Sequence, residues 1–212
     1  NIFYMFFIFL SFFISSFYFF SLGSLASKFL FNENLSAKDN YYEYALIGMI
    51  FASIIPFFLN FFFSLNKYLN DLIFILPIIL VLLYKINLKI SFKKIILCSF
   101  FAAIISTITM SYDNVYRPDA GLYHLPFISL INDQKIIIGL SNLHFRFGHT
   151  SIFQYLSGSF NNHIFGDNGI LIPHGLVFSF IILYLIKFIF KEQNNIKFFI
   201  TFLFLIFIFF RM

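Results

Sequence analysis

Long apolar runs fill most of this 212-residue chain, and six of them approach the length that is needed to cross a bilayer. Their approximate bounds are 2–22, 44–65, 72–88, 95–112, 169–190 and 196–210. The runs are continuous and do not alternate with a period of two, which favours helices over a membrane β-barrel. Because 60% of the residues are hydrophobic and 11% are charged, we predict an all-α, polytopic transmembrane helical bundle that forms one domain.

A single long polar stretch, residues 113–167, separates the fourth apolar run from the fifth. It contains four of the nine acidic residues and four of the five histidines, and histidine is absent from residues 1–123. Ionisable groups that gather in one loop of a membrane protein indicate that its chemistry takes place there. We therefore predict that this loop carries the functional site.

Two segments of the polar loop have the pattern of short helices. Asp119 can cap a helix over about 119–132 that contains Pro126, and Thr150 or Ser151 can start a second one over about 150–160. Both are apolar on much of their surface and too short to cross the hydrocarbon. We expect two short membrane-surface helices, with their apolar faces against the membrane or the spans.

Lysine and arginine predict the orientation of the chain, because cytoplasmic loops of membrane proteins carry the positive excess. If the stretches 23–43, 85–94 and 187–197 share one side, that side holds nine of the 14 basic residues, namely Lys28, Lys38, Lys85, Lys89, Lys93, Lys94, Lys187, Lys191 and Lys197. We place this side in the cytoplasm, the spans in a bacterial inner membrane, and the 113–167 loop in the periplasm or outside. The net charge of +5 then needs no nucleic-acid partner.

The chain ends and its cysteine add smaller expectations. The chain begins at Asn1 and stops at Met212 directly after an apolar run, so we expect a fragment of a longer protein. The first run is too long for a signal peptide and lacks the charged start and small-residue cleavage site. The one cysteine, Cys98, cannot form an intrachain disulfide, and we expect it to be buried as a small apolar residue.

The first candidate site is the segment YDNVYRPDAGLYHLP, residues 112–126. Within a dozen residues it gathers Asp113, Arg117, Asp119, Tyr123 and His124. A carboxylate at the membrane surface can act as a general base toward a sugar hydroxyl, or can hold a divalent cation against a phosphate. Arg117 can bind a phosphate oxygen. Asp119 can also simply cap the helix that follows Pro118, and capping is compatible with catalysis.

The second candidate site is the segment GLSNLHFRFGHTS, residues 139–151. Its glycines permit tight turns, and its side chains offer donors suited to an anionic headgroup, at Asn142, His144, Arg146 and His149. It can also be no more than a polar connector between two surface helices. No HxxxH or HExxH pattern occurs, so we predict no metal site built from histidines. Pro173-His174-Gly175, at the start of the fifth run, is either a kink alone or brings His174 into the same site.

These blocks resemble known membrane enzymes. An Asp shortly before Tyr-His-Leu-Pro on an outward loop, followed by surface helices and another span, resembles the GT-C superfamily of integral-membrane glycosyltransferases that use lipid-linked sugars. More closely, DAGLYHLP and GLSNLHFRFGHTSIFQYLSG resemble a group of bacterial membrane proteins with DxGLYH and GLxNLHxR blocks, commonly supposed to belong to that superfamily. The resemblance covers about 119–160 and implies that Asp119 is the catalytic base or a metal partner.

Two departures from the superfamily pattern accompany the resemblance. The acidic residue of that pattern often follows the first span, and here it follows the fourth. There is no Asp-x-Asp and no Asp-Glu pair, since Asp113 stands six residues before Asp119. The resemblance therefore does not determine a cofactor, although a divalent cation is compatible with it.

The function implied by the resemblance is transfer of a sugar from a polyprenyl-phosphate-linked donor to a cell-envelope glycan, lipid or protein. The partners are then membrane lipid and that donor. Arg117 and Arg146 would bind the phosphate, and His124 and His144 would orient the substrate. The other substrate-binding residues would be Asp113, Tyr123, Asn142 and His149.

Two non-catalytic functions remain as alternatives. A transporter or flippase of lipid-linked sugars would bind a phosphate with the same basic loop, but should show charged or Gly/Pro-broken segments at mid-membrane. The sequence offers Pro56 and Pro77 there and no carboxylate. A scaffold subunit of a glycan-assembly complex would tolerate the loss of Asp119.

Overall fold

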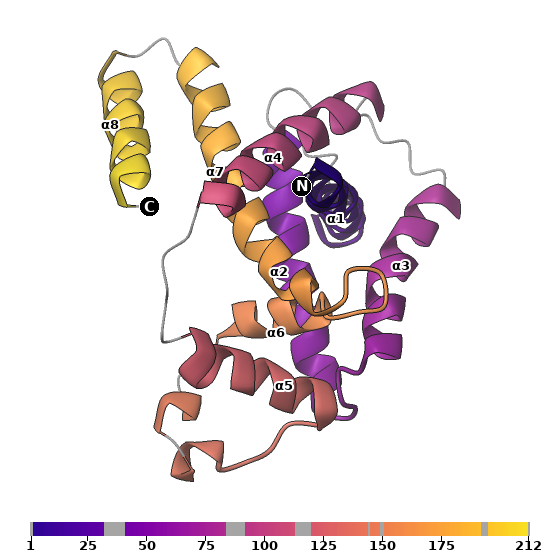
Figure 1. Cartoon of the computed structure of the whole chain (residues 1–212). Helices are drawn as coiled ribbons and strands as arrows, with labels where there is room; N and C mark the ends of the chain where they lie inside the picture. The colour runs from indigo at the N-terminus through magenta and orange to yellow at the C-terminus, as the bar shows by residue number, and fades with distance from the viewer. Residues whose placement is uncertain are drawn as a thin grey trace.

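The computed structural model of the protein describes residues 2–31, 41–83, 92–112, 120–143, 145–148, 151–191 and 195–211. Within these ranges the chain forms eight α-helices, one π-helical turn and three 3-10 turns (Figure 1). The long helices are α1 (Ile2–Phe31), α2 (Tyr41–Asn60), α3 (Lys67–Leu83), α4 (Phe92–Tyr112), α7 (Ile172–Lys191) and α8 (Asn195–Arg211). The loop elements are η1 (Ala120–His124), α5 (Leu125–Asp133), η2 (Leu140–Asn142), η3 (Phe145–Gly148), α6 (Ile152–Ser159) and η4 (Asp167–Leu171).

Each of the six predicted apolar runs contains a long helix, and the predicted class, an all-α polytopic membrane protein, is confirmed. The second helix ends at Asn60, before the predicted bound of 65, and residues 84–88 of the third run lie outside the described residues. Four helical stretches are long and apolar enough to cross a membrane: Met5–Phe29, Tyr41–Asn60, Lys93–Met110 and Asp167–Phe190. The other two runs form α3 and α8, with 17 residues each. At 1.5 Å per residue each is about 25 Å long, slightly shorter than the roughly 30 Å of hydrocarbon.

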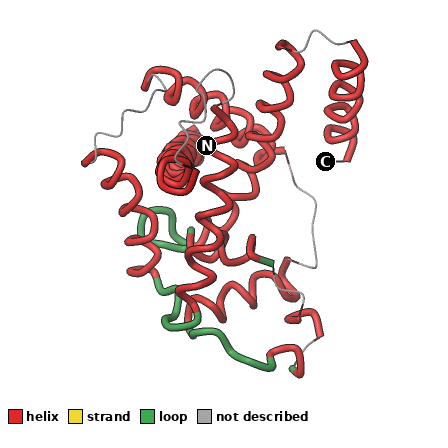
Figure 2. Tube along the Cα trace, turned by 180° about the vertical axis from the view of Figure 1, so that it is seen from behind, coloured by secondary structure: helices red, strands yellow, loops and turns green. Residues whose placement is uncertain are grey.

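Helix α1 lies at the centre of the bundle and packs on α2, α3, α4 and α7 (Figures 1 and 2). Its residues Tyr18, Phe19 and Phe20 are among the largest fully buried side chains. The Phe19 ring lies 5.4 Å from that of Phe160, at the end of α6, and 6.2 Å from that of Phe180 in α7. The core is therefore a set of aromatic rings in stacked and edge-to-face contact, which joins the spans to the short helix α6.

The backbones of α1 and α2 come very close together where the two helices cross. A Cβ added to Gly48 would lie 1.9 Å from the carbonyl oxygen of Phe19, and one added to Gly23 would lie 1.8 Å from that of Tyr44. The absence of side chains at both glycines lets the helices touch through their backbones, the usual way that small residues bring membrane helices together.

One end of the bundle carries lysines from the predicted cytoplasmic side. Lys187, near the end of α7, places its Nζ 4.5 Å from the centre of the Tyr41 ring, and Lys94, near the start of α4, lies 5.5 Å from that ring. Tyr41 itself begins α2. The start of α2, the start of α4 and the end of α7 therefore share one face, as the distribution of lysines predicts.

The two short helices of the loop form close to the predicted ranges, since η1 and α5 together span Ala120–Asp133, one residue beyond the predicted end, and α6 spans Ile152–Ser159. Helix α6 packs against α2, α3, α5 and α7, and its residues from Gln154 to Ser159 are buried (Figure 1). Burial raises the pKa of Tyr155, whose ring lies edge-to-face on Phe57 and Phe127. This phenol stays neutral and helps to hold α6 against the bundle.

Helix α8 stands beside α7, at the edge of the bundle (Figures 1 and 2). Its side chains are exposed on several faces, with Ile196 71% and Ile200 60% accessible. Helix α3 likewise exposes Leu72 and Leu76 along one side. Apolar surface of this extent on long helices is expected of a protein whose solvent is lipid.

Candidate functional site

Three of the predicted site residues come together where the loop enters helix α5. The π-helical turn η1 ends at His124, and Pro126 stands in the first turn of α5, where its missing N–H has no helical partner to lose. The rings of Tyr123 and His124 lie 4.2 Å apart. The guanidinium of Arg146, in η3, lies 4.9 Å from the centre of the Tyr123 ring. This cation–π contact joins the two predicted site segments.

Gln154, a side chain of α6, joins the group formed by Tyr123, His124 and Arg146. Gln154 is at the third position of α6, and its Nε2 lies 2.7 Å from Nδ1 of His124. Gln154 is held by a capping box, since its Oε1 accepts a hydrogen bond of 3.0 Å from the backbone N–H of Ser151. The hydroxyl of Ser151 in turn accepts from the N–H of Phe153 at 3.2 Å. The start of α6 therefore fixes the position of the group that touches His124.

His174, in the first turn of α7, faces the same helix. Its Nδ1 lies 3.5 Å from the hydroxyl oxygen of Ser157, and its ring lies edge-to-face on Phe153 at 4.8 Å. The next residue, Gly175, is so close to Met110 that an added Cβ would lie 3.3 Å from its Cγ. The start of α7 is therefore packed against the end of α4, and His174 lies beside α6 at that boundary.

We call Tyr123, His124, Arg146, Gln154 and His174 the imidazole cluster. His124 and His174 remain exposed, whereas Gln154 is buried. The cluster combines a guanidinium, two imidazoles and an amide. The contacts above join its members from η1, η3 and α6, and His174 of α7 adjoins them through Phe153 and Ser157 of α6. Side chains of this kind donate hydrogen bonds to phosphate and sugar oxygens. The position of the imidazole cluster at the end of the spans suits a ligand whose polar head lies at the membrane surface.

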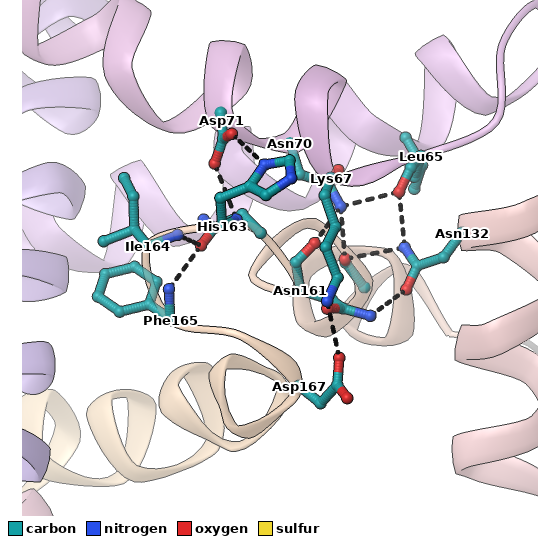
Figure 3. Close-up of polar contacts among 12 residues, drawn as sticks. Leu65, Lys67, Asn70, Asp71, Asn132, Asn161, His163, Ile164, Phe165 and Asp167 are labelled. Carbon is teal, nitrogen blue, oxygen red and sulfur yellow. Dashed lines mark hydrogen bonds and ion pairs between the residues drawn. The ribbon is translucent and has the colours of Figure 1, made fainter.

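A second polar group, which we call the asparagine cluster, consists of Asn60, Asn70, Asn132 and Asn161. The Nδ2 atoms of Asn70 and Asn132 both donate to the carbonyl of Leu65, at 2.8 Å each, and to that of Gly158, at 3.0 Å each (Figure 3). The Nδ2 of Asn161 donates to Oδ1 of Asn132 at 3.0 Å. These bonds tie the turn after α2 to the ends of α5 and α6.

Asn60, the last residue of α2, completes this cluster. Its Nδ2 lies 3.1 to 3.2 Å from the carbonyl oxygens of Phe63, Ile131 and Gln134. Its own carbonyl accepts a 2.9 Å bond from the N–H of Ile136. Asn60 and Asn70 are fully buried. Buried polar groups need such partners, so the cluster is a structural joint between the loop and the α2–α3 turn.

Two contacts between ionisable side chains lie at the exposed edge of the asparagine cluster. The Oδ2 of Asp71 lies 2.7 Å from Nδ1 of His163, and its Oδ1 accepts from the N–H of the same residue (Figure 3). Lys67 and Asp167 form an ion pair of 3.2 Å. Both pairs connect the start of α3 to the segment between α6 and α7.

The structure places four of the nine predicted site residues. It brings Tyr123, His124 and Arg146 together, whereas Asn142 lies exposed in the turn η2. The other five lie outside the described residues: Asp113, Arg117, Asp119, His144 and His149. Among the residues that the structure describes, no three His, Cys, Asp or Glu side chains form a group that could hold a metal ion.

Sequence reasoning missed Gln154 as a member of the site and left His174 open. The pattern Ser-x-x-Gln at 151–154 is a signal for the capping box, but not for the contact with His124, which is 30 positions away. The asparagine cluster was not predicted either. Its members are spread from Asn60 to Asn161, and asparagine is common in loops throughout the chain.

Comparisons with known proteins give one family and no closer relative. No curated protein and no solved structure matches the chain. A family model described as "Domain of unknown function (DUF8201)" matches residues 5–212. The match extends over all the helices described above apart from the first three residues of α1. The chain therefore belongs to the DUF8201 family.

Proposed function

We propose that the protein is a membrane glycosyltransferase of the bacterial inner membrane. It transfers a sugar from a polyprenyl-phosphate-linked donor to a cell-envelope glycan, lipid or protein. The observation that supports this proposal is the imidazole cluster, in which Tyr123, His124 and Arg146 meet beside helices long enough to span a membrane. A lipid-linked sugar phosphate presents its anionic head at that depth, while its chain stays in the hydrocarbon.

Arg146, His124 and Asp119 have different roles in this proposal. Arg146 binds a phosphate oxygen, and its contact with the Tyr123 ring limits the freedom of the guanidinium. His124 orients the sugar phosphate by hydrogen bonding. Asp119, which directly precedes η1 in the sequence, is the general base toward the acceptor hydroxyl or the partner of a divalent cation.

Replacement of Asp119 tests the catalytic role. Asn caps a helix about as well as Asp, so Asp119→Asn leaves a purely structural role intact. Loss of a general base or of a metal partner lowers the rate by about two decades or more. We expect that loss in an assay of glycan transfer by the full-length protein, at matched membrane expression. Asp113→Asn is the control, with a smaller expected effect. Nearly full activity of Asp119→Asn, with loss of protein in Asp119→Ala, would show that Asp119 only caps.

The proposed orientation has a separate test. We expect Lys135, in the loop, to face the outside and Lys93, at the start of α4, to face the cytoplasm; both are exposed in the fold. Cysteine is introduced at either position in a Cys98→Ser background, and spheroplasts are treated with a membrane-impermeant maleimide. Position 135 should react at once and position 93 only after the membrane is permeabilised. The reverse pattern would contradict both the orientation and a donor site that faces outward.

A further inference from the structure

The amide of Gln154 has only one orientation that satisfies its neighbours. Its oxygen accepts from the backbone N–H of Ser151 at 3.0 Å, and its nitrogen lies 2.7 Å from Nδ1 of His124. If the amide were turned over, its NH₂ group would face the N–H of Ser151, and two donors would oppose each other. The capping box therefore assigns the oxygen to Ser151 and the NH₂ group to His124.

The orientation of the amide determines where the imidazole carries its proton. An NH₂ group can only donate, so Nδ1 of His124 must accept, and an accepting ring nitrogen carries no proton. The neutral ring then has its proton on Nε2. A proton on Nδ1 would point at the NH₂ group across 2.7 Å. Two other cationic or titratable groups adjoin this position, Arg146 across the Tyr123 ring and His174 across α6, and neither offers an acceptor to Nδ1 of His124 in place of the Gln154 amide.

We propose that Gln154 is a positioning residue that holds His124 as the neutral Nε2–H tautomer, and thereby makes the imidazole a hydrogen-bond donor to an acceptor oxygen of the ligand. Gln154 is the one hydrogen-bond partner of the His124 ring among the residues that the structure describes. The donor role rests on the proposed sugar transfer, in which that oxygen belongs to the sugar phosphate, whereas the tautomer does not depend on it. In this arrangement His124 orients the ligand and does not act as the general base.

Substitution of Gln154 by glutamate should change the tautomer of His124 while it leaves the start of α6 intact. Glutamate is as suitable as glutamine at this position of a capping box, so Gln154→Glu keeps the acceptor for Ser151 and the start of α6. Its second oxygen, however, can only accept from His124, which requires a proton on Nδ1. Gln154→Met has similar length and removes both hydrogen bonds, so it leaves the imidazole free to take either tautomer.

The measurement is the ring ¹⁵N spectrum of the intact protein labelled at histidine, in lipid nanodiscs at neutral pH and without any substrate. His124→Asn assigns the resonances by their loss. In the parent protein we expect Nδ1 of His124 far downfield, as for a bare ring nitrogen, and Nε2 upfield, as for a protonated one. In Gln154→Glu the Nδ1 resonance should move upfield to the protonated position, and in Gln154→Met it should lie between the two.

Ser151→Ala is the matched control. It removes the hydroxyl that caps α6 but keeps the N–H that orients Gln154, so it should lower the melting temperature without changing the tautomer. A protonated Nδ1 in the parent, or the parent's tautomer in Gln154→Glu, would overturn the proposal. Because the spectra contain no substrate, these outcomes are independent of the transfer assay, and failure of sugar transfer alone would remove only the role of the ligand oxygen.

Discussion

Gly48→Ala is expected to prevent formation of a stable bundle. The added methyl group would lie 1.9 Å from the carbonyl oxygen of Phe19, and the obstacle is backbone rather than the end of a flexible side chain. Helices α1 and α2 would have to separate along the longest contact in the fold. Overpacking typically costs about 1–3 kcal/mol, and a clash between two backbones lies at or above the upper end. That is a large part of the roughly 5–15 kcal/mol by which proteins are stable.

The measurement is the yield of monodisperse protein in mild detergent, together with its melting temperature. Gly121→Ala is the matched control, because a Cβ at that position in η1 meets no atom within 4 Å. We expect the control to behave like the parent protein and Gly48→Ala to aggregate or to melt well below it. Equal melting temperatures for the two variants would show that α1 and α2 do not touch through these glycines.

Asn70→Asp is expected to have the second largest effect. The Nδ2 of Asn70 donates to the carbonyls of Leu65, Gly158 and Asn161 at 2.8 to 3.0 Å, and the residue is fully buried. Aspartate has the same shape but no hydrogen to donate, so an oxygen would face these acceptors. The carbonyls of Leu65 and Gly158 keep the amide of Asn132 as a donor, whereas the carbonyl of Asn161 loses this bond and the new buried carboxyl opposes all three carbonyls. At about 1–3 kcal/mol for each buried group left unsatisfied, we expect a loss of about 2–6 kcal/mol.

This second prediction is checked by thermal unfolding and by limited proteolysis of the 113–167 loop. The asparagine cluster joins the α2–α3 turn to α5 and α6, so its disruption should expose the loop to protease before the spans unfold. Asn168→Asp, at an exposed position of η4, makes the same chemical change and should leave both measurements unchanged. A similar melting temperature for Asn70→Asp and the parent would mean that the Asn70 amide does not hold the loop to the α2–α3 turn.

The helices were predictable because their signal is local. Apolar runs of sufficient length have no other stable form in a bilayer, so all six were found, and the Ser151 cap marked the start of α6. The ends of the runs were less certain: α1 extends to Phe31, nine residues beyond the predicted end of the first run, because polar residues such as Ser24 and Ser27 are buried against other helices.

The site was predictable only in part because its contacts are between distant positions. Tyr123 and Arg146 were both selected as polar or aromatic residues in a loop, but their cation–π contact depends on how η1 and η3 fold back. No local pattern reveals the contact of Gln154 with His124 or that of Asn70 with Gly158, since these partners lie 30 and 88 positions away. Similarly, Gly23 and Gly48 each begin a small-xxx-small pattern, with Ser27 and Ala52, but the pairing of one glycine with the other helix is visible only in three dimensions.

The burial of α6 has a consequence for the order in which the protein is made. This helix of eight residues, about 12 Å long, is too short for the insertion machinery to recognise as a span. Some of its neighbours, α2 and α3, leave the ribosome before it, but α7 is synthesised after it. Its docking must therefore follow the insertion of the later span, so the segment that orients His124 takes its place late in biogenesis, once the surrounding helices are already in the membrane.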